Sequence, residues 1–80
     1  MDTLFMINLI GWLGSAAVII AYVLVSTNRL RGDAVIYQAL NLIGGIFLAI
    51  NTFYLGAYPS TIVNLMWIGI AVFALARAKK

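Results

Sequence analysis

The residues with chemical capacity in this sequence are neutral amides, alcohols and aromatic rings set within long apolar stretches. The amides of these stretches are Asn8, Gln38, Asn41, Asn51 and Asn64. The chain has no histidine or cysteine, and no charged residue lies in its apolar stretches. Acid–base catalysis needs a group that titrates near neutrality, and metal sites use His, Cys or carboxylate ligands. We therefore expect no enzyme, no metal and no cofactor, but hydrogen bonding to an uncharged or zwitterionic polar ligand.

The composition is that of a membrane protein. Of 80 residues, 65% are hydrophobic, and the mean hydropathy is +1.09. Residues 3–28 and 34–76 contain no charge. The first stretch is long enough for one span of about 20 residues, and the second for two. The sequence predicts an all-α protein with one membrane domain, residues 1–80, whose helices cover about 4–27, 34–55 and 59–77.

The net charge of +3 has a one-sided distribution. Arg29 and Arg31 lie in the first predicted loop, and Arg77, Lys79 and Lys80 follow the third predicted helix. With three spans, the loop and the C-terminus lie on the same side of the membrane. Basic residues near span ends are retained in the cytoplasm. We therefore expect the N-terminus outside and the C-terminus inside, with membrane lipid and not nucleic acid as the neighbour.

Each predicted helix has one face of polar and small residues, which predicts contact with protein or water. Small residues let helix backbones approach closely in membranes. The residues expected at helix–helix contacts are Gly11, Ser15, Gly44, Gly45 and Ala49. We also expect Asp33 to cap the second helix and Trp12 to lie partly in a protein contact.

Several segments resemble the SemiSWEET proteins, bacterial half-transporters of the PQ-loop superfamily, or a related family of small three-span bacterial membrane proteins. The resemblance rests on Ile10-Gly11-Trp12, the loop from Thr27 to Asp33, Gly44 in the second helix, and the stretch Tyr58-Pro59-Ser60-Thr61-Ile62-Val63-Asn64. It implies a triple-helix bundle in the order 1-3-2, a parallel homodimer and a bacterial inner-membrane location. It also implies that Asn64 faces a central pocket.

The chain differs from that family at two functional positions. Ala21-Tyr22 stands in place of the Pro-Gln hinge of the first helix, and Leu48 falls at the place of a pocket tryptophan. Proline kinks a helix because it removes a backbone hydrogen bond, so this helix lacks that hinge. Trp67, about one turn after Asn64, is the aromatic residue expected to replace the missing ring.

These observations predict a small facilitator that moves a neutral or zwitterionic polar solute, sugars included, by alternating access as a homodimer. Asn64, Asn41 and Trp67 are the predicted solute contacts, and Tyr22 and Asn51 are the predicted constrictions. Two alternatives stay open. One is a membrane scaffold or accessory subunit whose polar faces bind a larger partner. The other is a holin-like lysis protein with no transport activity.

Overall fold

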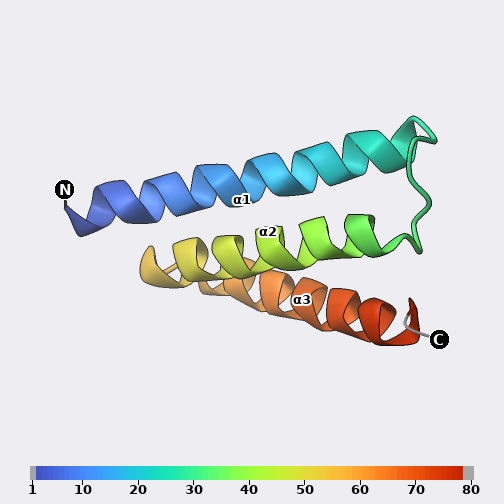
Figure 1. Ribbon diagram of the computed structural model, residues 1–80. Coiled ribbons are helices and arrows are strands. Elements are labelled where there is room, and N and C mark those ends of the chain that lie inside the picture. The colour runs from blue at the N-terminus through green and yellow to red at the C-terminus, as the bar shows by residue number, and fades with distance from the viewer. Residues whose placement is uncertain (1, 79–80) are drawn as a thin grey trace.

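The computed structural model describes residues 2–78 and consists of three α-helices (Figure 1). They are α1 (Thr3–Ser26), α2 (Val35–Tyr54) and α3 (Tyr58–Ala78). Each end lies within one residue of the predicted boundary. The helices run up, down and up along a molecule with a longest extent of 41 Å. This length exceeds the hydrocarbon thickness of a bilayer, which is about 30 Å.

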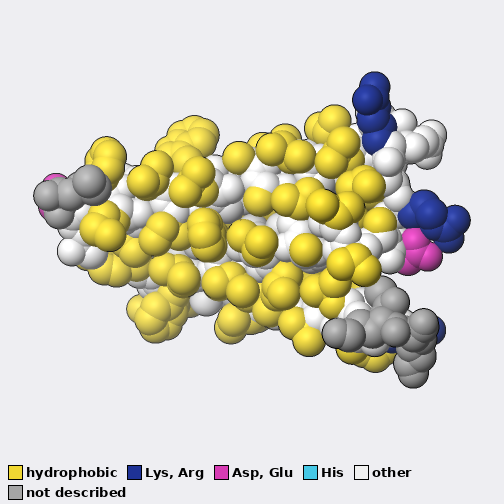
Figure 2. Space-filling view, viewed as in Figure 1, with side chains coloured by type: hydrophobic (Ala, Val, Ile, Leu, Met, Phe, Trp, Pro, Cys, Tyr) yellow, Lys and Arg dark blue, Asp and Glu magenta, His cyan; other side chains and the backbone are white. Residues whose placement is uncertain are grey.

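All three helices are long and apolar enough to cross a membrane. Hydrophobic side chains cover the length of the molecule, and the described arginines lie at the end that holds the α1–α2 loop (Figure 2). Asp2 lies at the opposite end. A charge-free middle with charged ends is the arrangement that a bilayer requires.

The helix ends follow from local chemistry. The Asp2 carboxylate accepts a hydrogen bond from the Phe5 backbone N–H at 2.7 Å and so caps α1. The chain leaves α1 through Asn28 and α2 through Gly56, with φ values of 63° and 77°. Asparagine and glycine are the residues that tolerate this left-handed conformation best.

The predicted cap of α2 is wrong. Ala34 occupies the N-cap position and makes no side-chain hydrogen bond to the helix. Asp33 instead accepts two hydrogen bonds from the Arg31 guanidinium, at 2.9 and 3.1 Å. A bidentate pair with an arginine satisfies this carboxylate within the loop.

The order 1-3-2 implied by the resemblance is also not the order of this structure. α2 packs against both α1 and α3, whereas α1 and α3 make no contact with each other within residues 2–78. The reason lies in two adjacent glycines of α2. Gly44 and Gly45 point about 100° apart around the helix, so each leaves space for a different neighbour.

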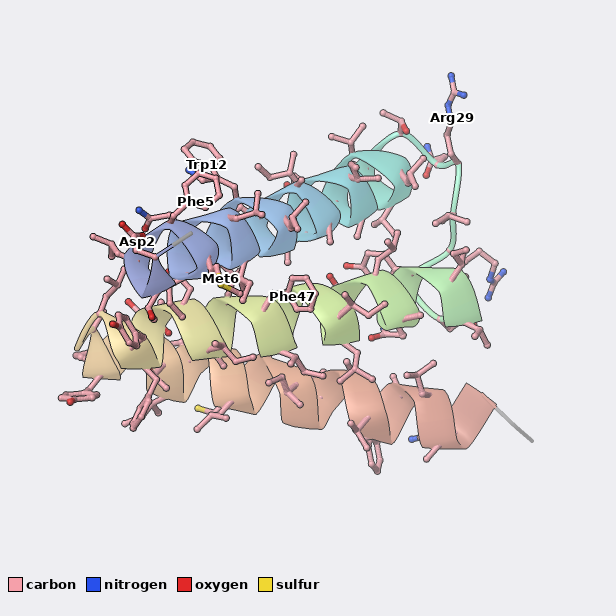
Figure 3. All side chains as sticks on the ribbon, turned by 60° about the vertical axis from the view of Figure 1, so that its left-hand side comes forward. Asp2, Phe5, Met6, Trp12, Arg29 and Phe47 are labelled. Atoms are coloured by element: carbon pink, nitrogen blue, oxygen red, sulfur yellow. The ribbon has the colours of Figure 1, made fainter. Side chains whose placement is uncertain are left out.

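The α1–α2 contact is closest at Gly14 and Gly44. A Cβ at Gly14 would lie 2.8 Å from the Phe47 Cβ and 3.0 Å from the Gly44 carbonyl oxygen. A Cβ at Gly44 would lie 2.6 Å from a methyl group of Val18. Phe47 points from α2 toward α1 (Figure 3). Gly14, which the sequence analysis did not single out, is therefore the closest counterpart of Gly44, and Ser15 is only half-buried beside it.

The α2–α3 contact uses the other glycine. A Cβ at Gly45 would lie 3.0 Å from Cγ1 of Ile68 on α3. Ala49 of α2 and Ala71 of α3 are buried, with 9% and 1% of their surface exposed. Small side chains thus set the spacing of both helix pairs, as expected where lipid provides no hydrophobic drive for association.

We predict that Gly14→Ala lowers the free energy of unfolding by about 1–3 kcal/mol, because the added methyl group meets backbone that cannot rotate away. Gly69→Ala is the matched control, since a Cβ there meets nothing within 4 Å. Reversible unfolding in mixed micelles measures both variants. Equal stability of the two variants would contradict the assigned α1–α2 contact.

Candidate functional site

Two hollows lie along one face of α2. The inner one, near the α1–α2 loop, includes Asn41, and the outer one, near the α2–α3 turn, includes Leu48. These residues are seven positions apart, so they lie on the same face of the helix. Gly44 faces α1 and Gly45 faces α3. The two hollows therefore follow one another along the side of α2 that lies between its two neighbours.

The inner hollow is a cavity of about 110 Å³ between α2 and α3. Its lining residues are Tyr37, Gln38, Asn41, Trp67, Ile70 and Ala71. This volume holds several water molecules or a small solute. Aromatic and aliphatic surface surrounds a few polar groups, which is the usual make-up of a small-molecule site.

Asn41 is the most deeply buried amide of the described chain, with 4% of its surface exposed. Its side chain makes no hydrogen bond to any residue from 2 to 78. An amide offers two donors and one acceptor, and those of Asn41 remain accessible from the cavity, because no fully enclosed side-chain nitrogen or oxygen of the described residues lacks a partner. The cavity beside Asn41 is where a hydrogen-bonding ligand would satisfy this group.

Gln38 lines both the cavity and a wider hollow at the loop end of the molecule. This wider hollow, about 660 Å³ in volume, is lined by Gln38, Asp33, Phe73 and Arg77, among others. The Gln38 amide donates to the Gly32 carbonyl at 2.9 Å, which holds it at the junction. The Arg77 guanidinium lies 5.6 Å from the centre of the Phe73 ring. The cavity at Asn41 thus has a polar approach from the loop side.

Three charged side chains lie at this mouth, because Asp33 and Arg77 line it and Arg31 pairs with Asp33. The Arg31 guanidinium hydrogen-bonds to the Asp33 carboxylate and lowers its pKa, while the same contact raises the pKa of Arg31. Both side chains are largely exposed. The pair therefore stays ionised and internally compensated at neutral pH, so it adds little net charge to the mouth.

The outer hollow, about 270 Å³ in volume, lies between α1 and α2. It is lined by Asn8, Gly11, Trp12, Ser15, Leu48, Asn51 and Leu55. The Asn51 amide donates to the Ile7 carbonyl at 2.9 Å and lies where a side chain at Gly11 would be. Asn51 therefore joins the outer halves of α1 and α2.

Asn64 belongs to a different cluster, at the outer end of the α2–α3 contact. Its amide donates to the Thr52 hydroxyl at 3.4 Å, and Thr61 donates to the same oxygen at 2.9 Å. Thr52 in turn donates to the Leu48 carbonyl at 2.8 Å. These contacts join α2 to α3. Asn64 thus has a hydrogen-bond partner, Thr52, within the protomer, whereas Asn41 has none within residues 2–78.

The structure thus divides the predicted site. Asn41 and Trp67 line one cavity, whereas Asn64 lies outside its lining. The two predicted constrictions do not meet, because Tyr22 is 68% exposed near the loop end of α1 and Asn51 binds Ile7 near the other end. Gln38 lines the cavity but was not among the predicted solute contacts. Its three-residue spacing from Asn41 places both residues on one helix face and was the signal in the sequence.

No group of three or more metal-ligating residues occurs among the described residues. Trp12 is 77% exposed and points outward from α1, so the predicted protein contact of Trp12 is not made within one protomer (Figure 3). What the site offers is therefore hydrogen bonding and aromatic surface.

The fold and its apolar surface define a small three-helix protein of the kind that spans membranes. A protein-family model matches residues 7–80, which is most of the chain, and the chain belongs to that family. The family is an uncharacterised one, so membership assigns no activity. No curated protein and no solved structure matches the chain.

We predict that the Thr52–Thr61 hydrogen bond couples α2 to α3. Thr52→Val and Thr61→Val, alone and combined, form a double-mutant cycle that isolates this bond. The expected coupling energy is about 0.6 kcal/mol, and at most about 1.7 kcal/mol, the range for hydrogen bonds between membrane helices. Additive effects of the two substitutions on the unfolding free energy would contradict the bond.

Proposed function

We propose that this protein is a membrane facilitator that passes a small neutral or zwitterionic polar solute across the bilayer as a homodimer. The resemblance to SemiSWEET half-transporters favours this class, and the family match neither adds to it nor opposes it. The observation on which the proposal rests is the buried Asn41 amide, which has no hydrogen-bond partner within residues 2–78 and borders a cavity.

A structural role alone accounts poorly for Asn41. Polar residues that join membrane helices bond to a neighbouring helix, as Asn51 does with Ile7 and Thr61 with Thr52. Asn41 makes no such bond to the described chain, although Trp67 and Ala71 of α3 lie beside it. A polar solute supplies the missing donors and acceptors, and Trp67 gives it an apolar surface for one face.

The same geometry supports access to the Asn41 cavity from the loop end. Gln38 lines both the Asn41 cavity and the hollow at the loop end. On the other side of the cavity, α2 and α3 approach each other closely at Gly45 and Ile68. With the loop in the cytoplasm of a bacterium, as its arginines favour, the protomer has an inward-facing site. One protomer leaves the side of α2 between α1 and α3 uncovered, so an enclosed passage requires a second copy.

Binding is tested with Trp67 as a fluorescent reporter. Trp12→Phe leaves Trp67 as the only tryptophan, because the chain has two. Glycerol, glucose and glycine, titrated separately into the protein in nanodiscs, sample three small polar chemistries. We expect at least one of them to shift the Trp67 emission with saturation, and the added Asn41→Leu substitution to remove that shift.

Transport is tested by osmotic swelling of proteoliposomes with the same three solutes. We predict that Asn41→Leu lowers the permeation rate at least tenfold without lowering stability, because the amide makes no bond to the described chain that the substitution would break. Asn64→Leu should show the opposite pattern, a loss of stability with permeation retained. Permeation unchanged by Asn41→Leu would overturn the assignment.

The same variants separate this proposal from the alternatives. In a scaffold or accessory subunit, Asn41 would bond to another protein, and Asn41→Leu would weaken assembly rather than permeation. A holin-like protein would release large and small solutes alike, because its rafts form wide openings. Swelling that does not distinguish glycerol from a large dextran would favour that class.

A further inference from the structure

We infer that the second copy binds along an uncovered seam of α1 formed by Asn8, Trp12, Ser15, Ile19 and Tyr22, so that the two α1 helices lie side by side and parallel. This inference deepens the proposed function, since it names the surface through which the homodimer forms. It rests on a pattern in α1 that the contacts within one protomer leave unused.

The seam follows a seven-residue repeat. Asn8, Ser15 and Tyr22 occupy one position of the repeat, and Trp12 and Ile19 occupy the position four residues later. This spacing is the one by which two helices remain in contact over several turns as a left-handed pair. It extends over most of α1, from the second turn to near the end.

A separate repeat of α1 already packs on α2. Ile7, Gly14 and Ala21 are buried, and their spacing is also seven residues. Each seam residue Asn8, Ser15 and Tyr22 follows one of these by a single position, which rotates it about 100° around the helix. α1 therefore has two contact stripes, one used within the protomer and one open.

The polar groups of the open stripe, unlike its Ile19 side chain, are unsuited to hydrocarbon. Trp12, Ile19 and Tyr22 are 77%, 61% and 68% exposed, and the side chains of Asn8 and Ser15 make no hydrogen bond within residues 2–78. Hydrocarbon offers these groups neither donors nor acceptors, so helices with such residues associate through them. The side of α1 turned away from the stripe is apolar at Leu13 and Ile20, which suits lipid.

A second copy of this chain fits the stripe better than an unrelated helix. A two-fold axis along the membrane normal places each residue at the same depth as its own counterpart. An amide, a serine hydroxyl and a tyrosine hydroxyl are each both donor and acceptor, so each can hydrogen-bond to its own copy. No charge lies in the stripe, so nothing in it repels an identical stripe.

This arrangement also completes the outer hollow. Asn8, Trp12 and Ser15 line that hollow together with Leu48 of α2 and Leu55, which directly follows α2. A helix on the seam would cover its open side, whereas the Asn41 cavity between α2 and α3 would keep its approach from the loop. The dimer would then be closed at the outer half and open at the inner half.

Disulfide cross-linking tests the seam directly, because the chain contains no cysteine of its own. Ser15→Cys places one thiol in the stripe, and Leu13→Cys places one on the opposite side of α1 at nearly the same depth. Both variants are reconstituted in liposomes at low protein density and oxidised with copper phenanthroline. We expect Ser15→Cys to form a dimer at least tenfold faster than Leu13→Cys.

The affinity of the dimer gives a second test that does not depend on the oxidant reaching the seam. Asn8→Leu should raise the dimer dissociation constant in micelles about tenfold, as measured by energy transfer between labelled copies, whereas Leu13→Ala should leave it unchanged. Equal cross-linking at positions 13 and 15, or a dimer insensitive to Asn8→Leu, would overturn the seam. Neither result depends on transport, so a dimer through α1 and a solute at Asn41 stand or fall separately.

Discussion

The adjacent glycines Gly44 and Gly45 are the constraint on which the rest of the structure depends. Because neighbouring helix positions point about 100° apart, the pair opens α2 toward two helices at once. α1 approaches through Gly14, and α3 approaches with Ile68. A Cβ at Gly44 would lie 3.0 Å from the Gly14 carbonyl oxygen of α1, and a Cβ at Gly45 would press on Cγ1 of Ile68 of α3 at 3.0 Å. α2 consequently lies between α1 and α3, and the face between these two contacts stays available for a ligand or a second copy.

The polar side chains of this apolar structure differ in whether they have a hydrogen-bond partner. Asn51, Thr52, Thr61 and Asn64 find partners on a neighbouring helix or on the backbone. Asn41, Asn8 and Ser15 find none within the described chain. Asn41 borders the cavity between α2 and α3, whereas Asn8 and Ser15 border the more open hollow between α1 and α2. The first arrangement suits a small solute, and the second suits another helix.

The number and ends of the helices were predictable, because charge-free length and turn residues determine spans almost independently of packing. The packing of the helices was not predictable, because it depends on how each helix is rotated about its axis. The sequence alone does not decide, for example, whether Gly14 or Ser15 of α1 contacts α2. The site was predictable in part. Asn41 and Trp67 could be chosen from their residue types. That Asn64 does not belong with them became clear only from its contact with Thr52 in the structure. Periodicity marks a polar face, yet it does not say which polar groups satisfy one another.

Native mass spectrometry of the intact protein released from lipid nanodiscs tests the central claim most directly, because stoichiometry and retained small molecules are read in one spectrum. The account predicts a discrete dimer that keeps a small polar molecule, with that molecule absent from the Asn41→Leu variant while the dimer persists. A monomer, or a ladder of large oligomers, would contradict the account.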